Sequence, residues 1–269
     1  MRIRVVDAFA EQAFTGNPAG VCILEAGDWP DEAWMQSVAA EMQHAETAFA
    51  RPSEADDADW DLRWFTPVVE VNMCGHATLA TTHALIADGL VTDRVRFSTR
   101  SGILSASADE GRITLDFPIS PVAPIDVPDG LIEALGTKPE EVCSTGPLTD
   151  VLVVLADEAA VRAVAPDLTQ LEAINRRDHN RGTIVTAPAD GEYDFVSRFF
   201  APVAGIPEDP VCGSAHTALA SYWSARLGRD ALVGYQASAR GGVLQVTVAG
   251  DRVNLGGTAI TVLDGELLV

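Results

Sequence analysis

The sequence predicts an α+β protein of two similar lobes, each a curled, mostly antiparallel sheet around a central helix. The first supporting observation is a repeat, since residues 63–80 (RWFTPVVEVNMCGHATLA) and 198–220 (RFFAPVAGIPEDPVCGSAHTALA) carry the same features in the same order. Each runs Arg-aromatic-Phe, a small residue, Pro, a loop, Cys-Gly and a small-residue helix, with 11 residues from Arg63 to Cys74 and 14 from Arg198 to Cys212. The second observation is that strand-like patterns surround both motifs.

The first half opens with two strand patterns separated by the turn-rich segment Phe14–Pro18. A helix is expected near Asp31–Gln43, because its apolar residues fall on one face. A second helix is expected from about Gly75 to Ala87, directly after the first Cys-Gly. The strands of this half are expected at Ile3–Phe9, Val21–Leu24, Glu46–Ala50, Asp61–Phe65, Arg94–Thr99, Ile103–Ser107 and Arg112–Phe117.

The Pro-rich stretch 117–128 is typical of a linker. After it, the second half repeats the arrangement of strands and helices predicted for the first half. Helices are expected near 158–175 and near 214–227, the latter after the second Cys-Gly. Strands are expected at Val151–Ala156, Thr183–Ala187, Tyr193–Phe200, Val243–Val248 and Arg252–Leu255. The predicted domains are 1–117, the lobe with the first motif, and 118–258, the lobe with the second. A closing strand over 259–269 follows, for which a return to the N-terminal lobe is one option.

The composition is that of a globular protein, with 47% apolar and 21% charged residues in a 269-residue chain. A net charge of −21 disfavours nucleic acids and anionic membranes as partners, because no basic surface is available for phosphates. The N-terminal segment carries Asp7 and Glu11 and does not resemble a signal peptide. No apolar run reaches the ~18 residues of a membrane span. We therefore expect a cytoplasmic protein.

No metal and no organic cofactor are expected. None of the four cysteines forms a CxxC pair, and the histidines lack HExxH spacing, which disfavours a zinc site. Cys22 lies in a strand pattern and Cys143 in a predicted loop, and both are expected to be inert. The single lysine, Lys138, lies in a turn-like segment and is poorly suited to a Schiff base. The glycine pairs do not form a nucleotide-binding motif.

The two Cys-Gly helix starts indicate an anion site. The backbone N–H groups at a helix start lack intrahelical partners and favour an anion, so Gly75 and Gly213 are candidate substrate-binding residues. If the two starts shared one cleft, they could hold a substrate carboxylate. Cys74 and Cys212 precede these helices, where a thiol pKa can fall to roughly 3.5–7.5. As a facing pair they could act as the two bases of a racemase or epimerase. The alternative is that they are small buried residues that pack tight turns.

Glu46 is the most informative single residue, because its place in the second half, near residues 181–183, holds no carboxylate. Partial burial at a strand start would raise the pKa of Glu46 and suit it to proton transfer, whereas the alternative is a surface glutamate. His76, two residues after Cys74, could hydrogen-bond a substrate or relay a proton. Asp209 could bind a substrate amine or hydroxyl, or simply open a turn. Ser214 is expected to cap the second helix or to bind substrate.

Together these residues resemble the phenazine-biosynthesis isomerase (PhzF-like) family, a branch of the diaminopimelate-epimerase-like fold. The matching segments are DAFAEQAFTGNPAGVCIL, AETAF, RWFTP, CGHATLA, RFFAP, GIPEDPVCGSAHTALA and VNLGGTAITVLDGEL, spread over nearly the whole chain in the family's order. The resemblance implies a homodimer of two-lobed subunits that needs no metal or organic cofactor. It also implies an isomerase like the one that moves a proton between ring carbons of a dihydro-hydroxyanthranilate.

Carried onto this chain, the resemblance makes Glu46 the acid/base. His76, Asp209 and Ser214 become the residues around the substrate, and the N–H groups of Gly75-His76 and Gly213-Ser214 become the carboxylate-binding helix starts. Two departures are Ala45, where Ser is expected, and Cys212, where the phenazine enzymes more often carry Thr. Cysteines at both motif positions are instead similar to diaminopimelate epimerase. We interpret the sequence as that of a cofactor-independent isomerase that acts on a small carboxylate. The alternatives are a two-cysteine epimerase and a non-enzymatic small-molecule-binding protein.

Overall fold

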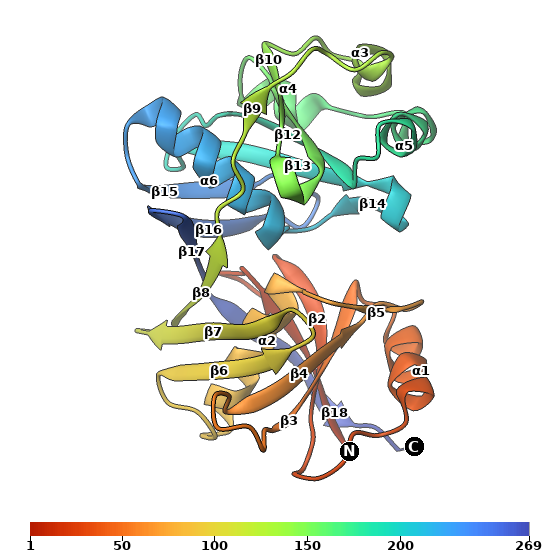
Figure 1. Ribbon diagram of the computed structural model, residues 1–269, viewed down its shortest axis with the longest axis vertical. Coiled ribbons are helices and arrows are strands. Elements are labelled where there is room, and N and C mark those ends of the chain that lie inside the picture. The colour runs from red at the N-terminus through yellow and green to blue at the C-terminus, as the bar shows by residue number, and fades with distance from the viewer. Residues whose placement is uncertain (269) are drawn as a thin grey trace. The chain divides into compact units, whose positions relative to one another are not determined.

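The computed structural model describes residues 1–268, and the chain forms two compact units (Figure 1). The first unit contains Met1–Asp116 together with the C-terminal residues from Gly256, and the second contains Phe117–Leu255. The α+β class predicted from the sequence is confirmed, because helices and a mixed sheet occur in both units. In the described part of the chain, no helix combines the length and the apolar character required to cross a membrane.

In the first unit, the strands form a sheet that is mostly antiparallel. Strand β1 pairs with β2 and β18, and β4 pairs with both β3 and β5, all antiparallel, whereas the pairs β2–β3 and β4–β6 are parallel. The elements of this unit are β1 (Arg2–Ala8), β2 (Asn17–Ile23), α1 (Glu32–Met42), β3 (Glu46–Pro52), β4 (Trp60–Phe65), β5 (Glu70–Val71), α2 (Gly75–Ala87), β6 (Arg94–Thr99), β7 (Gly102–Asp109), β8 (Arg112–Pro118) and β18 (Ala259–Glu266).

The second unit repeats this pairing scheme. Strands β11 and β12 are parallel, β13 is antiparallel to β12 and β14 but parallel to β15, and β15 is antiparallel to β16. The elements are β9 (Ala123–Pro124), α3 (Leu131–Leu135), β10 (Glu141–Ser144), β11 (Asp150–Val154), α4 (Glu158–Ala163), α5 (Leu168–Arg177), β12 (Gly182–Pro188), β13 (Phe195–Ala201), β14 (Ile206–Asp209), α6 (Gly213–Leu227), β15 (Ala231–Gln236), β16 (Gly242–Ala249) and β17 (Arg252–Gly257), with short 3-10 turns at Gly146–Leu148 and Pro202–Ala204.

The strand registers align the two units residue by residue. Phe49 lies opposite Arg63 in the first unit, and Val185 lies opposite Arg198 in the second. Counting back along β3 and β12 from these pairs makes Gly182 the counterpart of Glu46. Each of these strands also pairs parallel with its other neighbour, so that Glu46 opposes Ala19 and Gly182 opposes Asp150. The duplication inferred from the motifs is therefore present in the hydrogen-bonding pattern.

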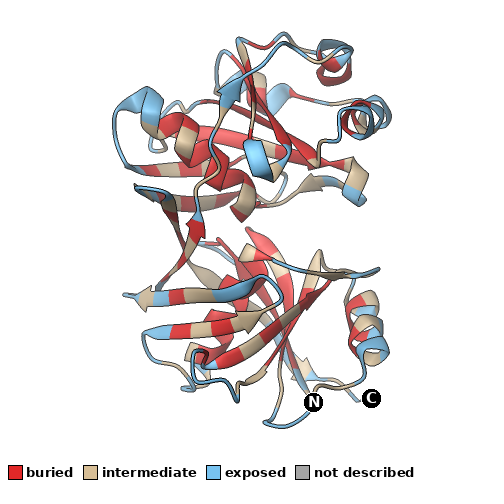
Figure 2. Ribbon diagram, in the orientation of Figure 1, coloured by how far each residue is buried: buried red, intermediate tan, exposed pale blue. Residues whose placement is uncertain are grey.

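Helices α2 and α6 are the central helices of their units. Each is apolar or small on all sides, and nearly every residue of the first three turns is buried (Figure 2). A helix that is apolar all round belongs in a core. Three buried threonines of α2 satisfy their hydroxyls within the helix, because each donates to the carbonyl four residues earlier, such as Thr78 to Cys74 at 2.6 Å. Burial of these helices fixes the positions of the Cys-Gly segments at their starts.

A matched ion pair braces each Cys-Gly segment. The guanidinium of Arg63 binds both carboxylate oxygens of Glu70, at 2.8 and 2.6 Å, and that of Arg198 binds Glu208 in the same way, at 2.7 and 3.0 Å. Each glutamate lies four residues before its cysteine. Two-point Arg–carboxylate pairs fix geometry as well as charge. The strand–loop–helix element is thus stabilised by an equivalent Arg–Glu ion pair in both units.

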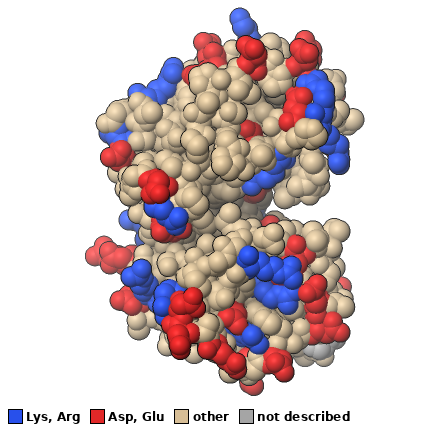
Figure 3. All heavy atoms as spheres, viewed as in Figure 1, with Lys and Arg blue, Asp and Glu red and all other residues tan. Residues whose placement is uncertain are grey.

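Most sequence-predicted elements are confirmed within one or two residues, and helix Gly75–Ala87 and strand Arg94–Thr99 match fully. Some expectations were wrong. Cys143 lies in β10 rather than in a loop, because this segment pairs antiparallel with β11. Asn17 and Pro18 belong to β2 rather than to the preceding turn. The predicted linker 117–128 contains the end of β8 and the short strand β9. On the face shown in Figure 3, acidic side chains are interspersed with arginines.

Candidate active site

In the first unit, three chemically reactive side chains come together at the start of α2. Glu46 is the first residue of β3, Cys74 is the residue before α2, and His76 is the second residue of that helix. One donor atom from each lies within 4.8 Å of the others. Cys74 and His76 are buried and Glu46 is half-buried, with 13% of its side chain exposed. The structure thus brings together three of the residues that the sequence singled out.

The His76 ring has a defined orientation. Its Nδ1 lies 3.3 Å from the side-chain nitrogen of Asn17 and 3.5 Å from the Cys74 thiol, and both neighbours can donate a hydrogen. We infer that Nδ1 accepts, so that the ring proton resides on Nε2. This atom lies 3.3 Å from a carboxylate oxygen of Glu46, in a contact that lacks hydrogen-bond alignment. Small movements of the carboxylate would complete a hydrogen bond from Nε2 to Glu46.

His76 is neutral at physiological pH. Burial lowers the pKa of His76 to about 3, because a charged imidazolium would lose its hydration inside the unit, and the nearby His44 adds to the effect. The start of a helix also disfavours a positive charge. A neutral imidazole next to Glu46 can donate one hydrogen bond but does not neutralise the carboxylate.

Glu46, Cys74 and His76 are also donor types that bind zinc. The thiol approaches the Nδ1 side of the ring, whereas the carboxylate approaches the Nε2 side. One ion bound to a single ring nitrogen would therefore require the ring or the carboxylate to move. The arrangement fits a hydrogen-bonded acid/base group better than a ready coordination shell.

The corresponding place in the second unit contains a different set of groups. Ser214 takes the position of His76, and its hydroxyl lies 3.2 Å from the Cys212 thiol. Asp209 ends β14 and accepts a hydrogen bond from the Val211 N–H at 3.1 Å. The side chain of Gln236, buried in β15, fixes the segment between Asp209 and Cys212. It accepts a hydrogen bond from the Cys212 N–H at 2.9 Å and donates one to the Asp209 carbonyl at 2.6 Å.

Burial shifts the pKa values of two groups in this second cluster. Burial raises the pKa of the Cys212 thiol to about 12, and the neighbouring Asp209 adds to the effect. For Cys212 this favours the alternative of a small buried residue over a thiolate, because desolvation outweighs the helix dipole. Burial likewise raises the pKa of Asp209 to about 6. Ser214 does not cap α6 as expected. Cys212 occupies the cap position without a side-chain cap bond, and Ser214 lies inside the helix.

The raised pKa of Asp209 predicts a pH-dependent stability difference. Because its folded-state pKa lies above the unfolded value, the folded state takes up the proton, and this stabilisation is lost as pH rises from about 4 through 6. We expect Asp209→Asn to leave stability unchanged near pH 4 and to stabilise the protein at pH 8, on the order of 2 kcal/mol. Urea unfolding of both proteins across pH 4–8 measures this. A constant difference across that range would contradict the assignment.

The two helix starts remain candidate anion sites. Gly75 and Gly213 are the first residues of α2 and α6, and the first N–H groups of each helix have no intrahelical acceptor. Both follow an extended cysteine, with φ of −147° at Cys74 and −106° at Cys212. Neither helix has an acidic side chain in its first turn that would repel an anion, so an anion is favoured there.

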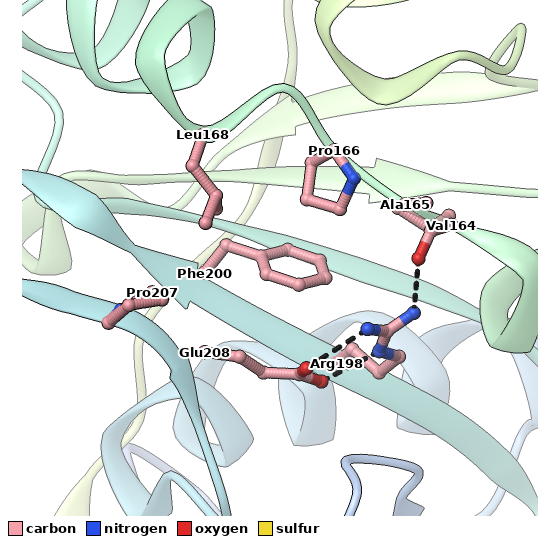
Figure 4. Close-up of a pocket in the computed structure, with 8 residues that line it drawn as sticks. All are labelled: Val164, Ala165, Pro166, Leu168, Arg198, Phe200, Pro207 and Glu208. Carbon is pink, nitrogen blue, oxygen red and sulfur yellow. Dashed lines mark hydrogen bonds and ion pairs between the residues drawn. The ribbon is translucent and has the colours of Figure 1, made fainter.

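A separate cavity of about 340 Å³ lies in the second unit and contains none of the predicted site residues (Figure 4). Arg198 at its edge is fully engaged, because it binds Glu208 and donates to the Val164 carbonyl at 2.6 Å. The cavity therefore offers apolar surface but no reactive group. It is lined by Val164, Ala165, Pro166, Leu168, Arg198, Phe200, Pro207 and Glu208.

The protein thus combines a duplicated α+β fold with a group of Glu46, Cys74 and His76 at the start of one central helix. The model of the phenazine biosynthesis-like protein family (PhzC-PhzF) matches residues 6–265, and the chain belongs to this family. An uncharacterized isomerase of Pseudomonas aeruginosa is 46% identical, covering 97% of this chain and 96% of its own. A phenazine biosynthesis-like domain-containing protein of Rattus norvegicus is 40% identical, with 98% of both chains covered.

Solved structures show the same fold. A PhzF-family phenazine biosynthesis protein of Enterococcus faecalis superposes with a TM-score of 0.93 at 42% identity, covering 100% of this chain and 99% of its own. A probable proline racemase from Agrobacterium radiobacter shares the fold alone, with a TM-score of 0.68 at 17% identity and coverage of 100% and 93%. The predicted diaminopimelate-epimerase-like architecture and the family resemblance are thereby confirmed.

Proposed function

We propose that this protein is an isomerase that moves a proton on a small carboxylate substrate, with Glu46 as the acid/base. The observation that carries the proposal is the contact between the Glu46 carboxylate and the neutral His76 at the start of α2. The family match and the curated relatives named as isomerases support the reaction class. As the resemblance implies, the reaction needs no cofactor, and the protein acts as a cytoplasmic homodimer.

In this mechanism, Glu46 removes a proton from one carbon of the substrate and returns it to another. The Glu46 carboxylate is shielded from bulk water, because 13% of its side chain is exposed and the oxygen nearest His76 is buried. His76 donates a hydrogen bond from Nε2, which orients Glu46 or stabilises charge that develops on the substrate. Asn17 is a positioning residue, because it sets the protonated nitrogen of the ring. Gly75, Gly213, Asp209 and Ser214 are the proposed substrate contacts.

The principal alternative is an epimerase that uses Cys74 and Cys212 as two bases. The raised pKa of Cys212 argues against it, because an effective thiolate base requires a lowered thiol pKa. We expect the double variant Cys74→Ser, Cys212→Ser to retain most of the activity. The measurement is solvent deuterium incorporation into a turned-over substrate, tested with dihydro-hydroxyanthranilates and small cyclic amino acids. A rate below one-hundredth of wild type would favour the cysteine mechanism.

A non-enzymatic role in binding small molecules is the second alternative. It predicts that carboxylates bind without exchange of any carbon-bound proton. The same deuterium experiment separates the two functions, since binding without exchange across the whole substrate panel would favour this alternative. The Glu46–His76 contact argues against it, because a half-buried carboxylate costs desolvation that the binding of a carboxylate ligand would not offset.

A further inference from the structure

Arg181 introduces a positive charge at the start of α6. It lies directly before β12, and its Nη1 donates to the Ser214 hydroxyl at 2.9 Å. Its Nε and Nη2 bind both oxygens of Asp150 at 2.9 and 2.5 Å. The Asp150 carboxylate is completely buried, whereas 35% of the Arg181 side chain is exposed. Asp150 therefore holds one edge of the guanidinium, and Nη1 lies at the start of α6.

The contact with Arg181 also determines what the Ser214 hydroxyl can do. A hydroxyl has one hydrogen to donate, and arginine can only donate. Ser214 must therefore accept from Arg181, which leaves its own hydrogen for another acceptor. The Cys212 sulfur, at 3.2 Å, is a weak acceptor that a carboxylate oxygen would outcompete. Arg181 thus makes Ser214 a donor for an incoming anion.

The first unit has no such charge in the equivalent place. By the strand registers, the counterpart of Arg181 is Ala45, and the counterpart of Gly182 is Glu46. One unit therefore carries an anion where the other carries a cation, one residue apart along equivalent strands. Phe199 stacks under the guanidinium at 5.1 Å, which restricts its movement further. The duplicated frame thus carries a carboxylate at this position in one unit and a guanidinium, paired with Asp150, beside it in the other.

We propose that Arg181 is a specificity-determining residue that selects a substrate with a carboxylate group through the Arg181–Ser214 pair at the start of α6. This inference rests on the proposed function, in which the substrate is a small carboxylate. Guanidinium and hydroxyl donors, together with N–H groups of the first helical turn, match the two oxygens of a carboxylate. An amide of the same shape would gain much less, since it carries no charge.

The test compares binding of benzoate and benzamide by calorimetry in three proteins. Wild type is expected to prefer benzoate. Asp150→Asn removes the competing anion but keeps Arg181, so it should bind benzoate at least as tightly. The double variant Arg181→Gln, Asp150→Asn replaces the ion pair by two hydrogen-bonding amides of similar size. It should bind benzoate at least tenfold more weakly than wild type and leave benzamide binding unchanged.

Unchanged benzoate affinity in the double variant would overturn the role of Arg181. A wild-type protein without any preference for benzoate would instead overturn the small-carboxylate part of the proposed function, so the two failures are distinguishable. If the double variant does not fold, Arg181→Lys serves in its place. Lysine keeps the charge near Asp150 but lacks the fork that also reaches Ser214. It should weaken benzoate binding about tenfold, and full retention would again overturn the inference.

Discussion

Replacement of Glu46 by Gln is expected to abolish isomerisation and leave the fold intact. A positioned general acid/base contributes roughly 10²–10⁴-fold to a rate, so the loss should reach at least that range. Gln has nearly the shape of Glu and can still accept a hydrogen bond from His76, but it cannot take up a proton from carbon. The measurement is the turnover rate of a substrate found in the deuterium screen.

The matched control for this change is Glu54→Gln, which alters an exposed glutamate outside the cluster. The control should keep the wild-type rate, and both variants should keep the wild-type unfolding midpoint. If Glu46→Gln retained normal turnover, the carboxylate would have no part in proton transfer. If it lost activity together with stability, the loss could not be assigned to chemistry.

The second large effect concerns Gly182, the counterpart of Glu46. A Cβ at this position would lie 2.6 Å from the Phe199 ring and 2.7 Å from the Phe200 carbonyl oxygen. The carbonyl belongs to the sheet backbone and cannot move aside as a flexible side chain could. We therefore expect Gly182→Ala to destabilise the protein by about 3 kcal/mol, at the upper end of overpacking effects. Urea unfolding measures this loss.

Gly265→Ala is the appropriate comparison, because its added Cβ would meet only a Leu263 methyl group at 3.6 Å, an ordinary contact. This variant should change stability by less than about 0.5 kcal/mol, as surface substitutions do. Equal, small effects in both variants would show that β12 has room for a side chain. A large effect at Gly182 alone would explain why the second unit carries no carboxylate at this position.

The sequence was sufficient to predict the repeat and the elements that position the candidate site. The central helices were predictable because each follows a Cys-Gly pair and runs on in small and apolar residues for three turns or more. The difference between Glu46 and its counterpart near residues 181–183 was also visible, since the motifs align the two halves. These features are local in sequence, so short-range patterns reveal them.

Other features depend on long-range contacts and were missed. Asn17 appeared to be a turn residue, and only the fold brings its amide within 3.3 Å of His76, 59 positions away. Gln236 and Asp150 act through partners 24 and 31 positions away in the sequence. The strands β5 and β14 are too short, at two and four residues, to show a period. For Cys212 the sequence left a thiolate and a small buried residue both open, because it reveals a helix start but not the burial that opposes ionisation.

The most direct test of Glu46 as the acid/base is the rate of solvent deuterium incorporation into substrate, measured side by side for two variants. Glu46→Gln should incorporate deuterium at one-hundredth of the wild-type rate or less. The double variant Cys74→Ser, Cys212→Ser should incorporate it at close to the wild-type rate. The reverse result, with normal exchange in the glutamine variant and no exchange in the double-serine variant, would contradict this assignment and establish the two cysteines as the proton-transfer groups.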